Sequence, residues 1–273
     1  MTQSVEACGA RPGRVALFGG IYSNHHALSA ALADARRRGA EKLYCLGDLG
    51  AFGPHPDLVF PLIAANAVET LAGNYDDSIA RGLDDCQCGY TDPRDNHYAR
   101  LSYRYTLANT SPRNREWLAT LPREIRFELG GRKVLLCHGS PRRQNEFLWE
   151  STTPDHFLEK LFRDHAADVI LATHTGIKWS RELPSGKLFA NVGVLGRPEN
   201  DGTARVWYAL CEATPPDGRP RIDFVPVEYD HAALAREMRA ENLPGEFIET
   251  IETGWWTTCL EVLPAKERLR GRW

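Results

Sequence analysis

The chain has 273 residues, of which 42% are hydrophobic and 25% charged, and its formal net charge is −3. This composition is ordinary for a soluble globular protein, and the small negative charge gives no reason to expect nucleic acid or a membrane as a partner. No apolar run approaches the roughly 18 residues that a transmembrane helix needs. Residues 1–14 lack the apolar core of a signal peptide, so we expect a cytoplasmic protein.

The cysteines are scattered, and a disulfide framework is not expected in a chain of this length without an export signal. They are Cys8, Cys45, Cys86, Cys88, Cys137, Cys211 and Cys259. Only Cys86 and Cys88, in "DDCQCGY", lie close together in the sequence. They are interpreted either as plain loop residues or as soft metal ligands or a thiol partner of a nearby site.

The first third of the chain is typical of an α/β protein. Apolar runs at 14–20 and 42–48 predict two strands, and the Ala- and Arg-rich segment 26–38 between them predicts a helix. A strand–helix–strand unit favours parallel strands. Residues 60–74 predict a second helix and a short strand that stops at Gly73-Asn74.

The middle of the chain combines an insertion with further strands. Residues 82–116 are polar with scattered aromatic residues, and the second half of this segment is predicted to be helical. Residues 125–141 predict a hairpin that turns at Gly130-Gly131. Two further strands are expected within 167–176 and 187–198, and a late hairpin within 204–213 and 221–229.

The C-terminal residues differ in pattern from the rest. They predict a helix, a Leu-Pro-Gly break at 243–245 and a second helix, followed by the adjacent Trp255 and Trp256. We expect residues 1–230 to form the main domain, with 82–116 inserted near its site. Residues 231–273 are expected to be an extension packed on that domain as a structural cap, a lid or dimer surface being the alternative.

Polar residues stand at the ends of four predicted strands: Asp48, Asn74, His138 and His174. Strand ends on one edge of a sheet converge in space, which is where α/β proteins place their sites. One carboxylate, one amide carbonyl and two imidazoles form a ligand set suited to a divalent transition metal such as Mn²⁺, Fe²⁺ or Zn²⁺. Each residue alone would be an ordinary turn cap or structural side chain.

Six ordered motifs give these residues a context. They are "GIYSN", "GDLGAFG", "GNYDD", "HGSP", "THTG" and "NVGVLG", spread over residues 14–230. In this order the sequence resembles the metallophosphoesterase (calcineurin-like phosphoesterase) superfamily, in particular its small bacterial and archaeal branch. The resemblance implies an α/β fold, a four-layer α/β-β/α sandwich with two mixed sheets and the site at the sheet edge, to which a C-terminal helical extension is added.

The resemblance also implies a divergent metal site. The family usually binds two metals, and the positions of one site correspond to Asp48, Asn74, His138 and His174, all present. The positions special to the other site correspond to Gly20, Tyr22 and Gly176, so all three of its own ligands are missing. We therefore expect one divalent metal per chain, and the glycines are expected to leave room for a larger substrate group.

The histidine of the family's Gly-Asn-His-Asp motif corresponds to Tyr75. By this resemblance Tyr75, with Asp76 beside it, is expected to orient or protonate the leaving group. In the first loop, Tyr22 and Asn24 are further candidate catalytic residues, and Tyr22 is also a candidate metal ligand. His25 and His26 follow at once, but neighbouring helical residues project about 100° apart, so we do not expect them to replace lost ligands.

Arginines flank two of the motifs and indicate the charge of the substrate. Arg142 and Arg143 follow "HGSP", and Arg197 follows "NVGVLG". Guanidinium groups bind phosphates and carboxylates in a bidentate manner. The alternative is that they are solvated charges of exposed loops.

Together these features predict a metal-dependent hydrolase acting on a small phosphorylated or otherwise anionic metabolite. Two other interpretations stay open: the same scaffold and single metal used for non-phosphoester chemistry, and a non-catalytic metal- or ligand-binding protein. Assembly into a homo-oligomer is also left open.

Overall fold

The computed structural model describes residues 4–6, 13–214 and 219–271. Cys8 and most of the N-terminal stretch that was judged for a signal peptide therefore lie outside the described residues. Among the helices that are described, none has the length and apolar character that crossing a bilayer would require.

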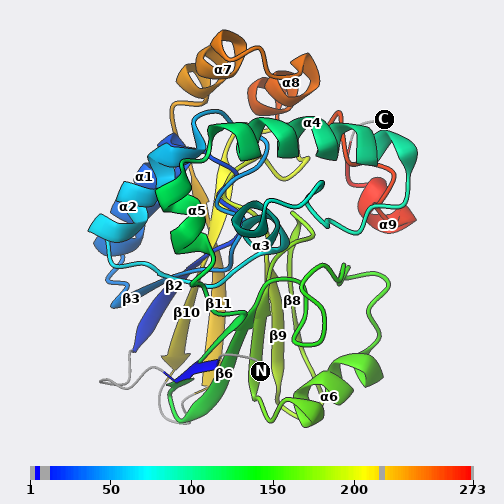
Figure 1. The fold of residues 1–273 in the computed structure, drawn as a ribbon. Coiled ribbons are helices and arrows are strands. Elements are labelled where there is room, and N and C mark those ends of the chain that lie inside the picture. The colour runs from blue at the N-terminus through cyan, green and yellow to red at the C-terminus, as the bar shows by residue number, and fades with distance from the viewer. Residues whose placement is uncertain (1–3, 7–12, 215–218, 272–273) are drawn as a thin grey trace.

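Two mixed sheets form the centre of the molecule (Figure 1). One sheet has the strand order β1-β5-β6-β7-β9-β8, and the other has the order β11-β10-β2-β3-β4. The strands of the first are β1 (Ser4–Glu6), β5 (Glu124–Leu129), β6 (Arg132–Cys137), β7 (Val169–Ala172), β8 (Lys178–Glu182) and β9 (Leu188–Val192). Those of the second are β2 (Arg14–Phe18), β3 (Lys42–Cys45), β4 (Glu69–Thr70), β10 (Val206–Thr214) and β11 (Arg219–Val227).

Helices lie on the outer faces of both sheets (Figure 1). In chain order they are α1 (His25–Arg37), η1 (Pro56–Leu58), α2 (Val59–Ala65), α3 (Asn74–Arg81), α4 (Pro93–Asn109), α5 (Pro112–Leu118), α6 (Asp155–Asp164), α7 (His231–Ala240), α8 (Gly245–Thr253) and α9 (Ala265–Arg268).

Alternation along the strands explains the layers, since successive strand residues face opposite sides of a sheet. In β2, Val15 and Leu17 enter the core between the two sheets, whereas Ala16 and Phe18 pack against the helices that include α1. In β7, Ile170 faces the outer core that α6 covers. The expected α/β sandwich with two mixed sheets and helices on both sides is thus confirmed.

The expected elements are present, and the described residues contain six further ones that were not anticipated: β1, η1, α3, α6, β8 and α9. Helix α3 begins at Asn74, where the sequence was interpreted as the end of a strand. The polar, alternating pattern of β8 is easily mistaken for a loop, because only Trp179 in its five residues is buried.

The insertion and the C-terminal extension pack on each other above the sheet edge (Figure 1). Tyr98 and Tyr105 of α4 donate hydrogen bonds to Glu246 and Glu241, at 2.7 and 2.9 Å. Phe247 of α8 is 2% exposed and belongs to the same core as α1. Its ring centroid lies 4.6 Å from that of Phe52, in the loop after β3.

If the extension is an integral part of this core, Phe247→Ala will lower the free energy of unfolding by about 3–5 kcal/mol, as for other buried aromatic residues. Leu269→Ala, at a side chain that is 77% exposed, is the matched control and is expected to change it by less than about 0.5 kcal/mol. Denaturant unfolding measures both. A Phe247→Ala protein as stable as the control would show that the extension does not support the core.

Candidate metal centre and cavity

Three buried side chains converge at the edge where the sheets end. Asp48 follows β3, His138 follows β6 and His174 follows β7. His138 Nε2 lies 3.2 Å from Asp48 Oδ2 and 3.2 Å from His174 Nδ1. One possible ligand atom from each residue falls within 4.8 Å of the other two, which is the spacing of a shared metal site.

The backbone at this site is held in an unusual conformation. Asp48 and His174 have φ values of 56° and 77°, in the left-handed region. Non-glycine residues there cost of order 1–3 kcal/mol each and gather at functional sites. Both residues lie just past the ends of their strands, and each has a side-chain atom 3.2 Å from His138 Nε2.

A hydrogen bond at the ring nitrogen that faces away from Asp48 fixes the orientation of His138. Its Nδ1 lies 2.6 Å from the carbonyl oxygen of Leu46, so Nδ1–H donates to that oxygen. In the neutral form of His138 the lone pair is then on Nε2, which faces Asp48 and His174. A second partner that sets the tautomer in this way is typical of metal-binding histidines.

The charges of the cluster suit a cation. Burial by itself would raise the pKa of Asp48, but the charge and hydrogen bond of His138 hold that pKa below its usual range. Burial and the neighbouring His138 lower the pKa of His174 to about 3, so its imidazole is neutral and has a free lone pair. Burial also lowers the pKa of His138, but Asp48 outweighs this effect and raises it above the ordinary value.

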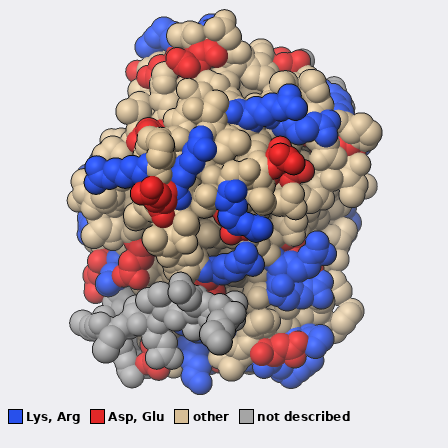
Figure 2. All heavy atoms as spheres, in the orientation of Figure 1, with Lys and Arg blue, Asp and Glu red and all other residues tan. Residues whose placement is uncertain are grey.

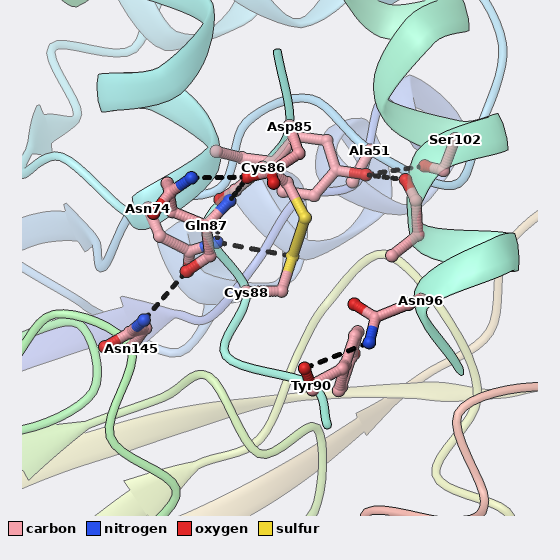
Figure 3. Close-up of a disulfide and its surroundings, with 12 residues drawn as sticks. Ala51, Asn74, Asp85, Cys86, Gln87, Cys88, Tyr90, Asn96, Ser102 and Asn145 are labelled. Carbon is pink, nitrogen blue, oxygen red and sulfur yellow. Dashed lines mark hydrogen bonds between the residues drawn. A yellow bond between two sulfur atoms is a disulfide. The ribbon is translucent and has the colours of Figure 1, made fainter. Parts of the chain in front are cut away.

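The side chain of Asn74 gives the clearest indication that this site binds a further ligand (Figure 3). Its Nδ2 donates to the carbonyl oxygen of Cys86 at 2.8 Å and lies 3.5 Å from Cys88 Sγ. Its Oδ1 is buried and has no hydrogen-bond partner. An unpaired buried carbonyl oxygen is costly unless it binds something. Because hydrogen bonds orient the amide nitrogen toward the loop, the amide oxygen is free to bind a cation. Together with Asp48, His138 and His174 it forms a set of ligands that fits a divalent metal.

The expectation for the two neighbouring cysteines is corrected by the structure. Cys86 and Cys88 form a disulfide, with their Cα atoms 5.3 Å apart (Figure 3). In this form neither sulfur is a thiolate, so neither is the soft ligand or thiol that we considered. The pair instead shapes the loop that holds Asn74, and Asn145 fixes the same loop by donating to the carbonyl oxygen of Gln87 at 2.9 Å.

Aromatic rings lie over Gly20 and Gly176, which contradicts the expectation that these glycines leave free space. A Cβ atom on Gly20 would lie 2.5 Å from Tyr22 Cε1, and one on Gly176 would lie 2.9 Å from Trp256 Cη2. Two aromatic rings therefore cover the positions where the family resemblance would place metal ligands. One ring comes from the first loop and the other from the C-terminal extension, for which a lid was an alternative expectation.

A small cavity of about 50 Å³ opens beside the cluster. Of the predicted site residues, Asp48, His174, Tyr22, Tyr75 and Arg197 line it. The other residues of its lining are Ala51, Phe52, Cys88, Tyr90, Tyr98, Ala99, Ser102, Phe247, Thr258 and Cys259. Since one water needs about 10–15 Å³ measured in this way, the space fits a group of a few heavy atoms.

The two tyrosines of the cavity differ in what their hydroxyl groups contact. Tyr75 Oη is 2.9 Å from Ser102 Oγ, so this hydroxyl already has a partner in the wall. Tyr22 Oη forms no hydrogen bond with a described residue. Burial, and then the charge of Asp48, raise the pKa of Tyr22, so this phenol keeps its proton and remains a donor.

The side chains of Asp76 and Asn24 accept hydrogen bonds from backbone amides. The Asp76 carboxylate accepts hydrogen bonds from the amides of Asp48, Leu49 and Gly73 at 2.6, 3.0 and 2.8 Å. Asn24 caps α1 by accepting from the amide of Ala27 at 2.9 Å. Neither residue lines the cavity, so both support the loops of the site and do not face a substrate.

Only one of the three arginines predicted to bind substrate lines the cavity. Arg142 and Arg143 do not line the cavity; Arg142 is half exposed and paired with Glu146. Arg197 is 6% exposed, and its guanidinium lies 3.6 Å from the ring centroid of Trp256. Arg197 Nε has no hydrogen-bond partner. Among the described residues no carboxylate forms an ion pair with Arg197, so this buried cation is available to an anion in the cavity.

Residues 14–214 match the model of the calcineurin-like phosphoesterase superfamily domain. The chain belongs to this superfamily. The match covers strands β2 to β10 and all four residues of the proposed metal centre; β1, β11 and the extension that provides Trp256 lie outside it.

Relatives of this phosphoesterase-family chain include an uncharacterized protein of Methanocaldococcus jannaschii, 28% identical over 244 residues that cover 84% of this chain and 93% of that protein. Among solved structures, a hypothetical protein from Pyrococcus horikoshii superposes with a TM-score of 0.74 at 23% identity, covering 89% of this chain and 99% of its own. A metallophosphoesterase from Sphaerobacter thermophilus gives 0.67 at 23% identity, covering 89% and 100%. These structures share the fold.

Sequence reasoning about this phosphoesterase-family chain missed the aromatic wall, namely Phe52, Tyr90, Tyr98 and Phe247. It also missed the position of Trp256 over Gly176. The available signal was the cluster of aromatic residues in segment 82–116 and the Trp255-Trp256 pair, which motif spacing alone could not place.

The closure of the second position can be tested at Gly176, whose φ is +80°. Gly176→Ala is expected to cost about 1–3 kcal/mol more than Gly186→Ala. Gly186 is a matched control, because its φ is +76° and nothing lies within 4 Å of its added Cβ, so it carries the backbone strain without the collision. Equal losses of unfolding free energy would mean that Trp256 does not fill this place.

Proposed function

We propose that the protein is a metal-dependent phosphoester hydrolase that works with one divalent ion held by Asp48, Asn74, His138 and His174. The observation that supports this most strongly is the unpaired, buried Oδ1 of Asn74. The next residue, Tyr75, donates its backbone amide to Asp48, which clusters with the two histidines. Membership of the phosphoesterase superfamily supports the reaction class. The buried Arg197 supports an anionic substrate.

When bound, the ion would supply Lewis-acid chemistry by polarising a phosphoryl oxygen and activating a water. The chain's own residues then bind and orient the substrate. Arg197 holds the phosphoryl oxygens, and its stacking on Trp256 keeps the guanidinium plane in place. Tyr22, whose hydroxyl is free and protonated, donates a hydrogen bond to the leaving oxygen. In this scheme Tyr75 shapes the wall.

The size and lining of the cavity restrict the substrate. About 50 Å³ beside the metal ligands suits a single phosphoryl group. The aromatic side chains around it exclude water and favour an apolar or aromatic leaving group over a strongly hydrated one. We therefore infer a small phosphomonoester or phosphodiester with such a group, taken into the cavity at its phosphate end.

The metal centre is tested by elemental analysis and by hydrolysis of p-nitrophenyl phosphate and bis(p-nitrophenyl) phosphate with added Mn²⁺. His174→Ala removes a direct ligand, so the affinity for Mn²⁺ is expected to fall by more than about 100-fold, beyond the loss seen for outer partners. Mn²⁺-dependent hydrolysis is expected to disappear with it.

The control for this measurement is His156→Ala, at an exposed histidine of α6. It should bind as much Mn²⁺ as the wild type and hydrolyse as fast. Unchanged metal content in His174→Ala would contradict the proposed ligand set. A wild type that binds Mn²⁺ at these residues but hydrolyses neither ester would favour the other two interpretations, non-phosphoester chemistry or a binding protein.

The role of Arg197 is tested by Arg197→Met. Charged hydrogen bonds are worth about 1.5–3 kcal/mol, so KM for the ester is expected to rise about 10- to 100-fold while Mn²⁺ content stays at the wild-type level. Arg142→Met, which alters a charge outside the cavity, should leave KM unchanged. A rise in KM for both variants, or for neither, would show that Arg197 does not bind the substrate.

A further inference from the structure

A second group of metal-ligating side chains lies outside the cavity. It consists of His25 and His26, at the start of α1, and Glu237 of α7. One possible ligand atom from each lies within 4.8 Å of the other two. None of the three lines the cavity beside Asp48, so this cluster is a separate feature of the molecule.

The two imidazoles do not diverge as neighbouring helical residues ordinarily would. Their ring centroids are only 4.0 Å apart, with 36° between the planes. Both Nε2 atoms turn toward the same carboxylate: His26 Nε2 is 2.9 Å from Glu237 Oε1, and His25 Nε2 is 3.8 Å from Glu237 Oε2. This corrects the expectation, drawn from helix geometry, that the pair would point in different directions.

The cluster has an unsatisfied donor atom of its own. Glu237 Oε2 is buried and has no hydrogen-bond partner, although a carboxylate oxygen in that position should have one. The side chains are nevertheless reachable, because those of His25, His26 and Glu237 are 19%, 23% and 30% exposed. An ion from solution can therefore reach these side chains.

The donor types and spacing select the kind of ion. Two imidazole nitrogens and one carboxylate oxygen are ligands of Zn²⁺ and of similar borderline ions, and are too rich in nitrogen for Ca²⁺ or Mg²⁺. With Zn–N and Zn–O bonds of about 2.0–2.2 Å, tetrahedral ligands stand roughly 3.3–3.6 Å apart. The separations of 2.9 and 3.8 Å from nitrogen to oxygen bracket this value.

We propose that His25, His26 and Glu237 form a Zn²⁺-binding site that joins the first helix of the phosphoesterase domain to the C-terminal extension. The fourth position is left to water. Helix α7 precedes α8, whose Phe247 lines the cavity. By binding α7 to α1, Zn²⁺ would therefore hold the C-terminal extension in the position where it completes the cavity wall.

The test uses the full chain with the Asp48 centre disabled by His174→Ala, so that the two sites are not confused. After treatment with a chelator, Zn²⁺ alone is added, and bound metal is counted by elemental analysis and titration calorimetry. We expect one Zn²⁺ per chain and a Zn²⁺-dependent rise in Tm. Adding Glu237→Gln or His26→Gln should weaken binding by at least about 10-fold and remove the rise in Tm.

Matched controls in the same background are Glu249→Gln, which removes an exposed carboxylate of α8, and His97→Gln, which removes an exposed imidazole of α4. Both should bind Zn²⁺ as the parent does. No Zn²⁺ bound by the His174→Ala protein would overturn the proposal, and so would binding that survives both Glu237→Gln and His26→Gln. Neither result bears on the proposed hydrolase, whose ligands are a different set.

Discussion

The site is organised around one buried carboxylate. Asp48 is 3% exposed, and a charge taken out of water is stable only when positive or donor groups surround it. The backbone amide of Tyr75 donates to Asp48 Oδ1 at 3.1 Å, and His138 approaches Oδ2. The left-handed backbone at Asp48 and the three amides that hold Asp76 beneath it form the frame for this arrangement. In the proposed function, a divalent cation between Asp48 and the histidines completes it.

The proposed one-metal site exchanges one kind of stabilisation for another. Where the resemblance implies ligands for a second ion, Tyr22 and Trp256 lie over glycines. Trp256 also stacks on Arg197 and donates from its Nε1 to the carbonyl oxygen of Pro198 at 2.7 Å. A positive group, the guanidinium, thus stands near the place where the second metal would have been. In this account the arginine takes over the binding of phosphate that a second ion would supply.

On the face shown in Figure 2, Lys and Arg are interspersed with Asp and Glu, and no extended region has one sign alone. The positive charge that matters for the proposed function is instead buried, at Arg197. A buried guanidinium selects by shape as well as by charge, because an anion must enter the cavity to reach it.

Much of this could be predicted from the sequence, for a physical reason. Strand alternation and strand-end polar residues are local signals, and they correctly brought Asp48, His138 and His174 to one edge. Contacts between distant segments leave no such signal. Nothing in the spacing of Trp256 places it over Gly176, and nothing in "NHHA" reveals that Glu237 lies opposite. The backbone partners of Asp76 and Asn24 could not be predicted either, because a polar residue that binds the backbone looks in sequence like one that binds a substrate.

The central claim is that one metal position is kept and the other is closed by aromatic rings. Anomalous diffraction from crystals soaked in Mn²⁺ tests it most directly. The account predicts a single anomalous peak at this centre, within coordination distance of Asp48, Asn74, His138 and His174, with Tyr22 and Trp256 in place beside it. A second peak sharing Asp48, with Tyr22 or Trp256 displaced, would contradict the account, and so would the absence of any peak at these residues.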